Sequence, residues 1–76
     1  MAFEKLRKML AERLGVSEDK IKPESHLVGD LGLDSLDYIE LLMDLEEDFG
    51  IAIPDEEAKK LTTVQSVVDL INSHLQ

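Results

Sequence analysis

The apolar residues of this 76-residue chain recur at intervals of three and four, which is the spacing of one face of an α-helix. The first segment keeps this spacing from Phe3 to Leu14, and Gly15 then interrupts it. The pattern therefore predicts a helix over residues 2–14.

A connection without helical spacing follows over residues 16–34, and Pro23, Gly29 and Gly32 break it up. Residues 17–20 could form a single helical turn within it. Loops of this length are uncommon in compact domains and are often functional. Its apolar residues are expected to hold it against the core, namely Val16, Ile21, Leu27, Val28, Leu31 and Leu33.

Three more helices are predicted after this connection. The second covers residues 35–49 and ends at Gly50, a short third opens at Pro54, and the last begins near Thr63. Since no useful strand alternation appears, the fold class is all-α. We expect a small four-helix bundle with three longer helices, one short helix and a long first loop, forming a single domain over residues 1–76.

Size and composition exclude several classes of function. A chain this short has a modest core and no room for an enclosed active site, so we do not expect an enzyme. Cysteine is absent, which excludes disulfides and thiolate metal sites. No signal peptide and no apolar run long enough to span a membrane occurs. An isoelectric point near 4.4 disfavours nucleic acid and acidic membrane surfaces as partners.

The negative charge is concentrated in the middle of the chain. Residues 23–58 contain twelve Asp and Glu residues and no Lys or Arg, in a chain of net charge −9. An acidic helix face is often only a solvated surface. Solvated faces usually mix charges of both signs, however, so this stretch favours a docking surface for positively charged partners.

A helical projection of residues 35–49 separates charged from apolar side chains. One side, here named the acidic stripe, consists of Asp37, Glu40, Asp44, Glu47 and Asp48. The opposite side is expected to face the core and consists of Tyr38, Leu42, Leu45 and Phe49, with Leu41 at its edge. Leu36 and Met43 border the acidic stripe, where they could serve as apolar anchors for a partner.

Ser35 stands where the second helix begins, and two interpretations are open. The simpler one is an N-cap, a role that serine favours. The other is that the hydroxyl carries a phosphate ester at the positive end of the helix dipole. A hydrolase is poorly supported, because no G-x-S-x-G motif surrounds Ser35 and we interpret His26 and His74 as surface or packing residues. No metal-binding motif is present, although loose divalent binding to the carboxylates fits the charge.

The stretch from Gly29 to Asp37, GDLGLDSLD, resembles the prosthetic-group attachment site of acyl carrier proteins. The resemblance continues through residues 40–50, 53–58 and 62–64 and so covers essentially the whole chain. It implies that a separate phosphopantetheinyl transferase attaches 4′-phosphopantetheine from coenzyme A to Ser35. It also implies that Asp34, the acidic neighbour of that serine, helps to hold magnesium in the transferase complex.

The same resemblance implies cargo and partners. Growing acyl chains would be held as thioesters on the cofactor and presented to fatty-acid synthesis enzymes with basic docking patches. Those patches would meet Asp37, Glu40, Glu47 and Asp48, with Asp44 adding charge, Leu36 and Met43 adding apolar contacts, and Asp55 and Glu56 extending the surface. An acyl chain is expected between the helices, near residues such as Leu45 and Phe49.

We therefore expect a free-standing, monomeric, cytoplasmic acyl carrier protein of the fatty-acid-synthesis type. Two alternatives stay open: a carrier for polyketide or other specialised acyl assembly, and an unmodified acidic helical adaptor. Gly29, Tyr38 and His26 are less usual for the family, and they leave the pathway and the acyl chains undetermined.

Overall fold

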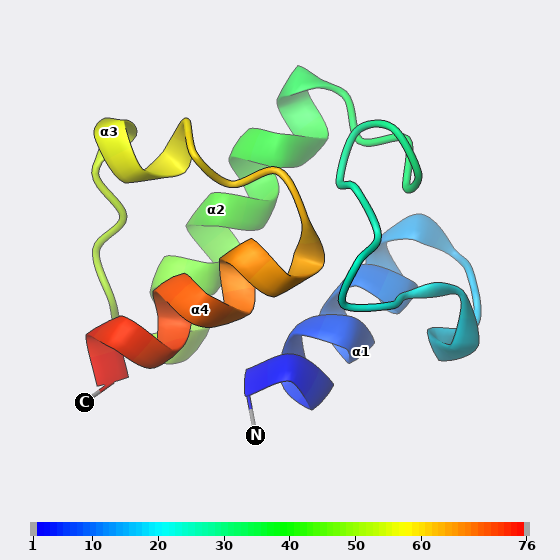
Figure 1. The fold of residues 1–76 in the computed structure, drawn as a ribbon, viewed down its shortest axis with the longest axis horizontal. Helices are drawn as coiled ribbons and strands as arrows, with labels where there is room; N and C mark the ends of the chain where they lie inside the picture. The colour runs from blue at the N-terminus through cyan, green and yellow to red at the C-terminus, as the bar shows by residue number, and fades with distance from the viewer. Residues whose placement is uncertain (1, 76) are drawn as a thin grey trace.

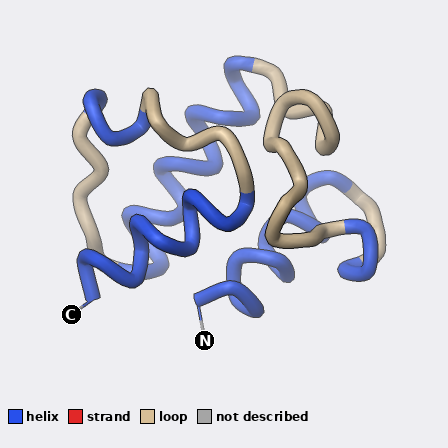
Figure 2. The backbone as a smooth tube through the Cα atoms, in the orientation of Figure 1, coloured by secondary structure: helices blue, strands red, loops and turns tan. Residues whose placement is uncertain are grey.

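The structure is a computed structural model that describes residues 2–75, and its backbone is helical with connecting loops (Figures 1 and 2). Its helices are α1 (Ala2–Leu14), α2 (Ser35–Phe49), α3 (Asp55–Ala58) and α4 (Val64–Leu75), with a 3₁₀ turn at Glu18–Lys20. No β-strand occurs among the described residues. The predicted all-α bundle, with three longer helices, one short helix and a long first loop, is confirmed.

The three longer helices share one apolar core. Each buries one apolar face, because removing aliphatic side chains from water is the main favourable contribution to folding. The innermost side chains, all with 2% or less of their surface exposed, are Leu6, Leu10, Ile21, Leu27, Leu33, Leu41, Leu45, Val64, Val67 and Ile71.

The buried face of α2 is rotated relative to the predicted one. Leu41, expected at the edge of the core-facing side, is 1% exposed and packs beside Leu45. Tyr38 and Leu42 are only half-buried, although they contact the core. The difference arises because the flank of α2 with Leu41 and Leu45 meets the core. The flank with Tyr38 and Leu42 borders a cavity instead.

The long first loop is fixed to the start of α4. The Leu27 N–H donates to the Thr62 carbonyl at 2.9 Å, and the Val64 N–H donates to the Ser25 carbonyl at 3.0 Å. Ile21, Leu27 and Leu33 are buried as predicted, whereas Val16 and Val28 are exposed, so the prediction was wrong for these two. Val28 turns outward because it begins a tight turn that closes with the Gly32 N–H donating to its carbonyl.

The end of α2 leads directly into α3. Gly50 adopts a left-handed conformation with φ of 65°, which ends α2 as predicted and favours glycine. The Glu46 carboxylate then accepts a hydrogen bond from the Ile53 N–H at 2.8 Å, which holds the connecting segment against α2. Pro54 is the N-cap of α3. The short helix lies alongside the first half of α2, from which it is separated by a cavity (Figure 1).

Two features are absent from the described part of the chain. None of its helices has the length and apolar character that crossing a membrane requires. No group of three or more His, Asp or Glu side chains within residues 2–75 is arranged to hold a metal ion.

Candidate functional site

The candidate site lies where the long loop enters α2. Gly32 takes the left-handed conformation with φ of 72°, and the next residue, Leu33, is buried in the core. Asp34 follows as the N-cap, and its Oδ1 accepts a hydrogen bond from the Asp37 N–H at 2.8 Å. In return, the Asp37 carboxylate accepts from the Asp34 N–H at 3.4 Å, which completes a capping box.

Ser35 is the first residue of α2, and its side chain is exposed. Because Asp34 caps the helix, the interpretation of Ser35 as the N-cap is wrong. The Ser35 hydroxyl also takes no part in the side-chain hydrogen bonds found within residues 2–75. It therefore stands at the positive end of the helix dipole without a structural task, which suits a hydroxyl that carries a phosphate ester.

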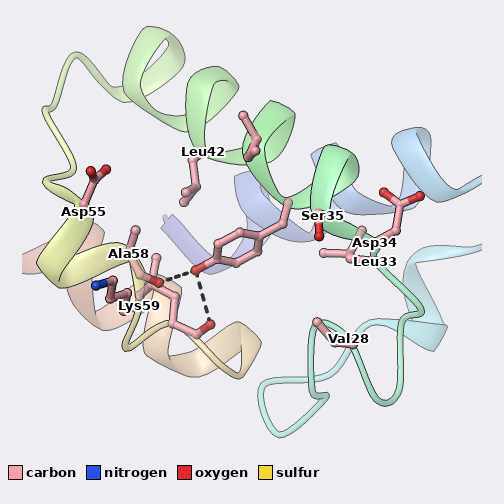
Figure 3. Close-up of a pocket in the computed structure, with 11 residues that line it drawn as sticks. Val28, Leu33, Asp34, Ser35, Leu42, Asp55, Ala58 and Lys59 are labelled. Carbon is pink, nitrogen blue, oxygen red and sulfur yellow. Dashed lines mark hydrogen bonds between the residues drawn. The ribbon is translucent and has the colours of Figure 1, made fainter.

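An open cavity of about 710 Å³ begins beside Ser35 and runs between α2 and α3. This volume falls within the range of about 300–1,000 Å³ that is usual for small-ligand sites. Figure 3 shows Ser35 and Val28 at one end of the cavity and Asp55 at the other, with the Asp34 carboxylate directed away from it. The cavity is lined by Val28, Leu33, Asp34, Ser35, Tyr38, Ile39, Leu42, Asp55, Ala58, Lys59 and Leu61.

Tyr38 spans this cavity from α2 toward the end of α3. Its hydroxyl donates to the Ala58 carbonyl and lies 3.4 Å from the Leu61 carbonyl, as the dashed lines in Figure 3 mark. Burial raises the pKa of the Tyr38 phenol above its ordinary value, because the charged phenolate would lose solvation. The phenol is therefore neutral at physiological pH and ties α2 to α3.

The sequence did not identify most residues of this cavity. Ile39 has a recognisable signal, since it lies three residues after Leu36 and four before Met43, and all three side chains are more than half exposed. Val28 has no such signal, because its outward orientation depends on the fold of the loop. Ala58 and Leu61 are ordinary core-like residues whose role becomes visible only when α3 is placed beside α2.

The expected path of an acyl chain near Leu45 and Phe49 does not match the cavity. Leu45 is fully buried in the core, and Phe49 is half-buried with the Lys5 Nζ 4.8 Å from the centre of its ring. Neither residue lines the cavity beside Ser35. The cavity lies about two turns nearer to Ser35 along α2 than these two residues.

The acidic stripe is partly paired with a cation from another helix. Arg13 of α1 donates one hydrogen bond to Glu40 at 2.9 Å and another to Asp44. Partial burial by itself lowers the pKa of the Arg13 guanidinium, but the hydrogen bonds and charges of Asp44 and then Glu40 outweigh it and raise the pKa above its ordinary value. Residues 23–58 contain no Lys or Arg, but in the folded protein a cation from α1 neutralises part of their negative charge.

The remaining predicted docking residues are accessible. Leu36 is 64% exposed and Met43 is 61% exposed, as expected for side chains outside the core. Glu47, Asp48, Asp55 and Glu56 are exposed, and Asp37 is half-buried because it takes part in the capping box. Leu36, Met43, Asp37, Glu47 and Asp48 belong to α2, which begins at Ser35, whereas Asp55 and Glu56 belong to α3.

One comparison with known proteins bears on this site. A protein-family model described as a phosphopantetheine attachment site matches residues 4–71 of the chain. The match includes the loop, all of α2 and α3, and the core positions of α1 and α4.

Proposed function

Because this chain belongs to the family of phosphopantetheine attachment domains, we propose that Ser35 is the residue to which the cofactor is joined. A domain of this family is the attachment site for covalent 4′-phosphopantetheine, is modified by a phosphopantetheinyl transferase, and carries acyl groups. When bound, the cofactor supplies a thiol that holds acyl groups as thioesters. The observation that supports Ser35 as the attachment residue is its exposure at the first position of α2, where Asp34 and not Ser35 provides the cap.

The attachment step uses the Ser35 oxygen as a nucleophile. That oxygen attacks the phosphorus nearest the pantetheine part of coenzyme A, and the pyrophosphate P–O bond breaks. Adenosine 3′,5′-bisphosphate leaves, and the hydroxyl proton passes to a base on the transferase. The ester that forms places its negative phosphate at the N-terminus of α2, where the helix dipole favours it.

Asp34 serves two purposes in this proposal. It fixes the start of α2 through the Asp37 N–H, and so it fixes the position of Ser35. Its carboxylate charge also helps to hold magnesium in the complex with the transferase. The variant Asp34→Asn separates the two, because the amide oxygen still accepts the capping hydrogen bond while the charge is lost.

We infer that the cargo is a reduced acyl chain, as in fatty-acid synthesis. Beyond its rim, the cavity presents Val28, Leu33, Ile39, Leu42 and Leu61, and the Tyr38 hydroxyl is already hydrogen-bonded. Burying several keto groups among these side chains would leave carbonyl oxygens without donors, which is costly, and Lys59 in the lining could serve at most a few of them. This apolar lining supports a fatty-acid-type carrier over a polyketide carrier.

Partner enzymes are proposed to dock along α2. The acidic stripe supplies charges that attract basic patches, and Leu36 and Met43 supply apolar contacts beside Ser35. Asp55 and Glu56 extend the negative surface across the cavity to α3. This arrangement would orient an enzyme over the attachment residue.

The test of attachment is an intact-mass measurement after incubation with coenzyme A, Mg²⁺ and a phosphopantetheinyl transferase. The native protein should gain the mass of one phosphopantetheine, and Ser35→Ala should gain none. Ser17→Ala is the matched control, because Ser17 is also exposed and precedes a short helical turn without capping it. Modification of Ser35→Ala, or no modification of the native protein, would contradict the proposal and favour an unmodified adaptor.

The test of cargo class compares two acyl groups of equal length on Ser35, one saturated and one with keto groups along the chain. The saturated chain should raise the melting temperature more, because it fills the apolar cavity without burying unpaired oxygens. An equal or larger rise with the keto chain would favour polyketide assembly instead.

A further inference from the structure

We propose that Tyr38 sets the depth of the cargo cavity and thereby limits the length of acyl chain that this carrier can shelter. This inference rests on the proposed function, because it assumes an acyl chain attached at Ser35. Tyr38 lies one helical turn after Ser35, so it is the first large side chain of α2 that a chain entering the cavity would meet.

The position of Tyr38 between cavity and core carries the argument. Its side chain lines the cavity and also packs against the buried core cluster. Leu33, Leu42 and Leu61 complete this boundary, since each lines the cavity and either belongs to the core or contacts it. A chain that reached deeper between α2 and α3 would have to displace one of these four side chains.

Tyr38 is the member of this boundary with the strongest attachment to α3. A leucine can change rotamer within an apolar cavity without losing a directional contact. Tyr38 would give up its hydrogen bond to the Ala58 carbonyl and its close approach to the Leu61 carbonyl. Losing a partly buried hydrogen bond leaves both groups unsatisfied, so displacement of the ring is resisted.

The hydroxyl also determines what the cavity wall offers to cargo. Its single proton is used by a backbone carbonyl, so at Tyr38 the wall presents an aromatic ring and no unoccupied donor to the chain. Apolar chains should therefore gain from entering the cavity up to this ring, and further carbons should remain outside in solvent.

The experiment loads Ser35 with a series of straight saturated acyl groups of increasing length, transferred from the corresponding coenzyme A thioesters. The melting temperature of each loaded protein is compared with that of the protein carrying 4′-phosphopantetheine without an acyl group. Each methylene group that enters the cavity should raise the melting temperature by about 3–6 °C. In the native protein the rise should stop at a defined chain length.

Three variants isolate the contribution of Tyr38. Tyr38→Ala removes the ring and should move the plateau to longer chains. Tyr38→Phe keeps the ring without the hydroxyl, so its plateau should shift less than that of Tyr38→Ala. Phe49→Ala is the matched control, because it removes an aromatic side chain from α2 that does not line the cavity, and it should leave the plateau in place.

The outcomes separate this inference from the proposed function. If Ser35 cannot be loaded, the proposed attachment fails. If Ser35 is loaded and the plateau lies at the same length in the native protein and Tyr38→Ala, Tyr38 does not set the depth. If Tyr38→Ala does not fold, an unchanged plateau in Tyr38→Leu, which also lacks the hydroxyl and the ring, overturns the inference in the same way.

Discussion

The two flanks of α2 are held in different ways. On the flank toward α1, Arg13 pairs with Glu40 and Asp44, and the Lys5 ammonium lies 3.3 Å from the Asp48 carbonyl oxygen. On the flank toward α3, an apolar cavity separates the helices and the neutral Tyr38 hydroxyl reaches across it to the Ala58 carbonyl.

This difference suits a protein that must keep one residue fixed while cargo comes and goes. The α1 flank and the buried Leu41 and Leu45 fix the position of α2, and with it the position of Ser35. On the α3 flank, the residues that line the cavity lie apart from those contacts. The helix that begins at Ser35 is thus anchored away from the cavity.

The largest expected loss of stability comes from truncating a leucine of α2 in the core, compared with truncating one beside the cavity. Leu45→Ala removes a side chain that is fully buried and should lower the free energy of unfolding by about 2–5 kcal/mol. Leu42→Ala should cost clearly less, because Leu42 is half-buried and borders an open cavity. Chemical denaturation measures both, and equal losses would mean that the α3 flank is as tightly packed as the core.

The hydrogen bond across the cavity should have the next largest effect. Tyr38→Phe should lower the free energy of unfolding by about 0.5–1.5 kcal/mol, because it removes the hydroxyl but keeps the ring. Leu42→Met changes the same wall while keeping an apolar side chain of similar volume, and it serves as the control. No loss in Tyr38→Phe would mean that this bond does not hold α3.

The same hydroxyl predicts a pH dependence. Since burial raises the pKa of folded Tyr38 above the unfolded value of about 10, the stabilisation is complete below that pH and decreases as the pH rises through the folded pKa. Tyr38 is the single tyrosine and the chain has no tryptophan, so tyrosinate absorbance reports this group alone. An onset of absorbance at the same pH in folded and unfolded protein would contradict the burial argument.

The ion pairs on the α1 flank should contribute less. Arg13→Gln should cost about 0.2–1 kcal/mol for each pair lost at low salt, because Glu40 and Asp44 are substantially exposed. The loss should shrink as salt screens the remaining charges. Lys8→Gln is the control, since it removes an exposed cation from the same helix. An equal, salt-independent loss in both variants would show that Arg13 has no specific role.

Glu47→Lys is expected to have the smallest effect on stability. Its effect on the rate of binding to a partner enzyme should be clear. Glu47 is exposed, so its reversal should change the free energy of unfolding by no more than about 0.5 kcal/mol. Association with a basic partner enzyme should slow, mostly at low salt. Stopped-flow association rates measure this change. Unchanged rates would identify the acidic stripe as a solvated surface only.

Much of the fold and the central residue of the site could be predicted from the sequence. Helix α2 runs from Ser35 to Phe49 with Gly50 as its C-cap, as predicted, because apolar spacing and a glycine stop signal act over only a few residues. The prominence of Ser35 followed from the same local signals and from the motif around it. Of the two interpretations of Ser35, the N-cap one is wrong, because Ser35 and Asp34 are both good capping residues and only the backbone shows that Asp34 takes the role.

The sequence by itself determined where the helices lie and that an exposed serine opens an acidic helix. Only the tertiary structure decided that Arg13 meets Glu40 across 27 positions, that Tyr38 reaches Ala58 across 20, and that Val28 faces the cavity. The physical reason is the distance along the chain over which each kind of interaction acts. Periodicity, caps and turns depend on near neighbours, whereas these contacts depend on how far each helix is rotated and how closely it approaches the next.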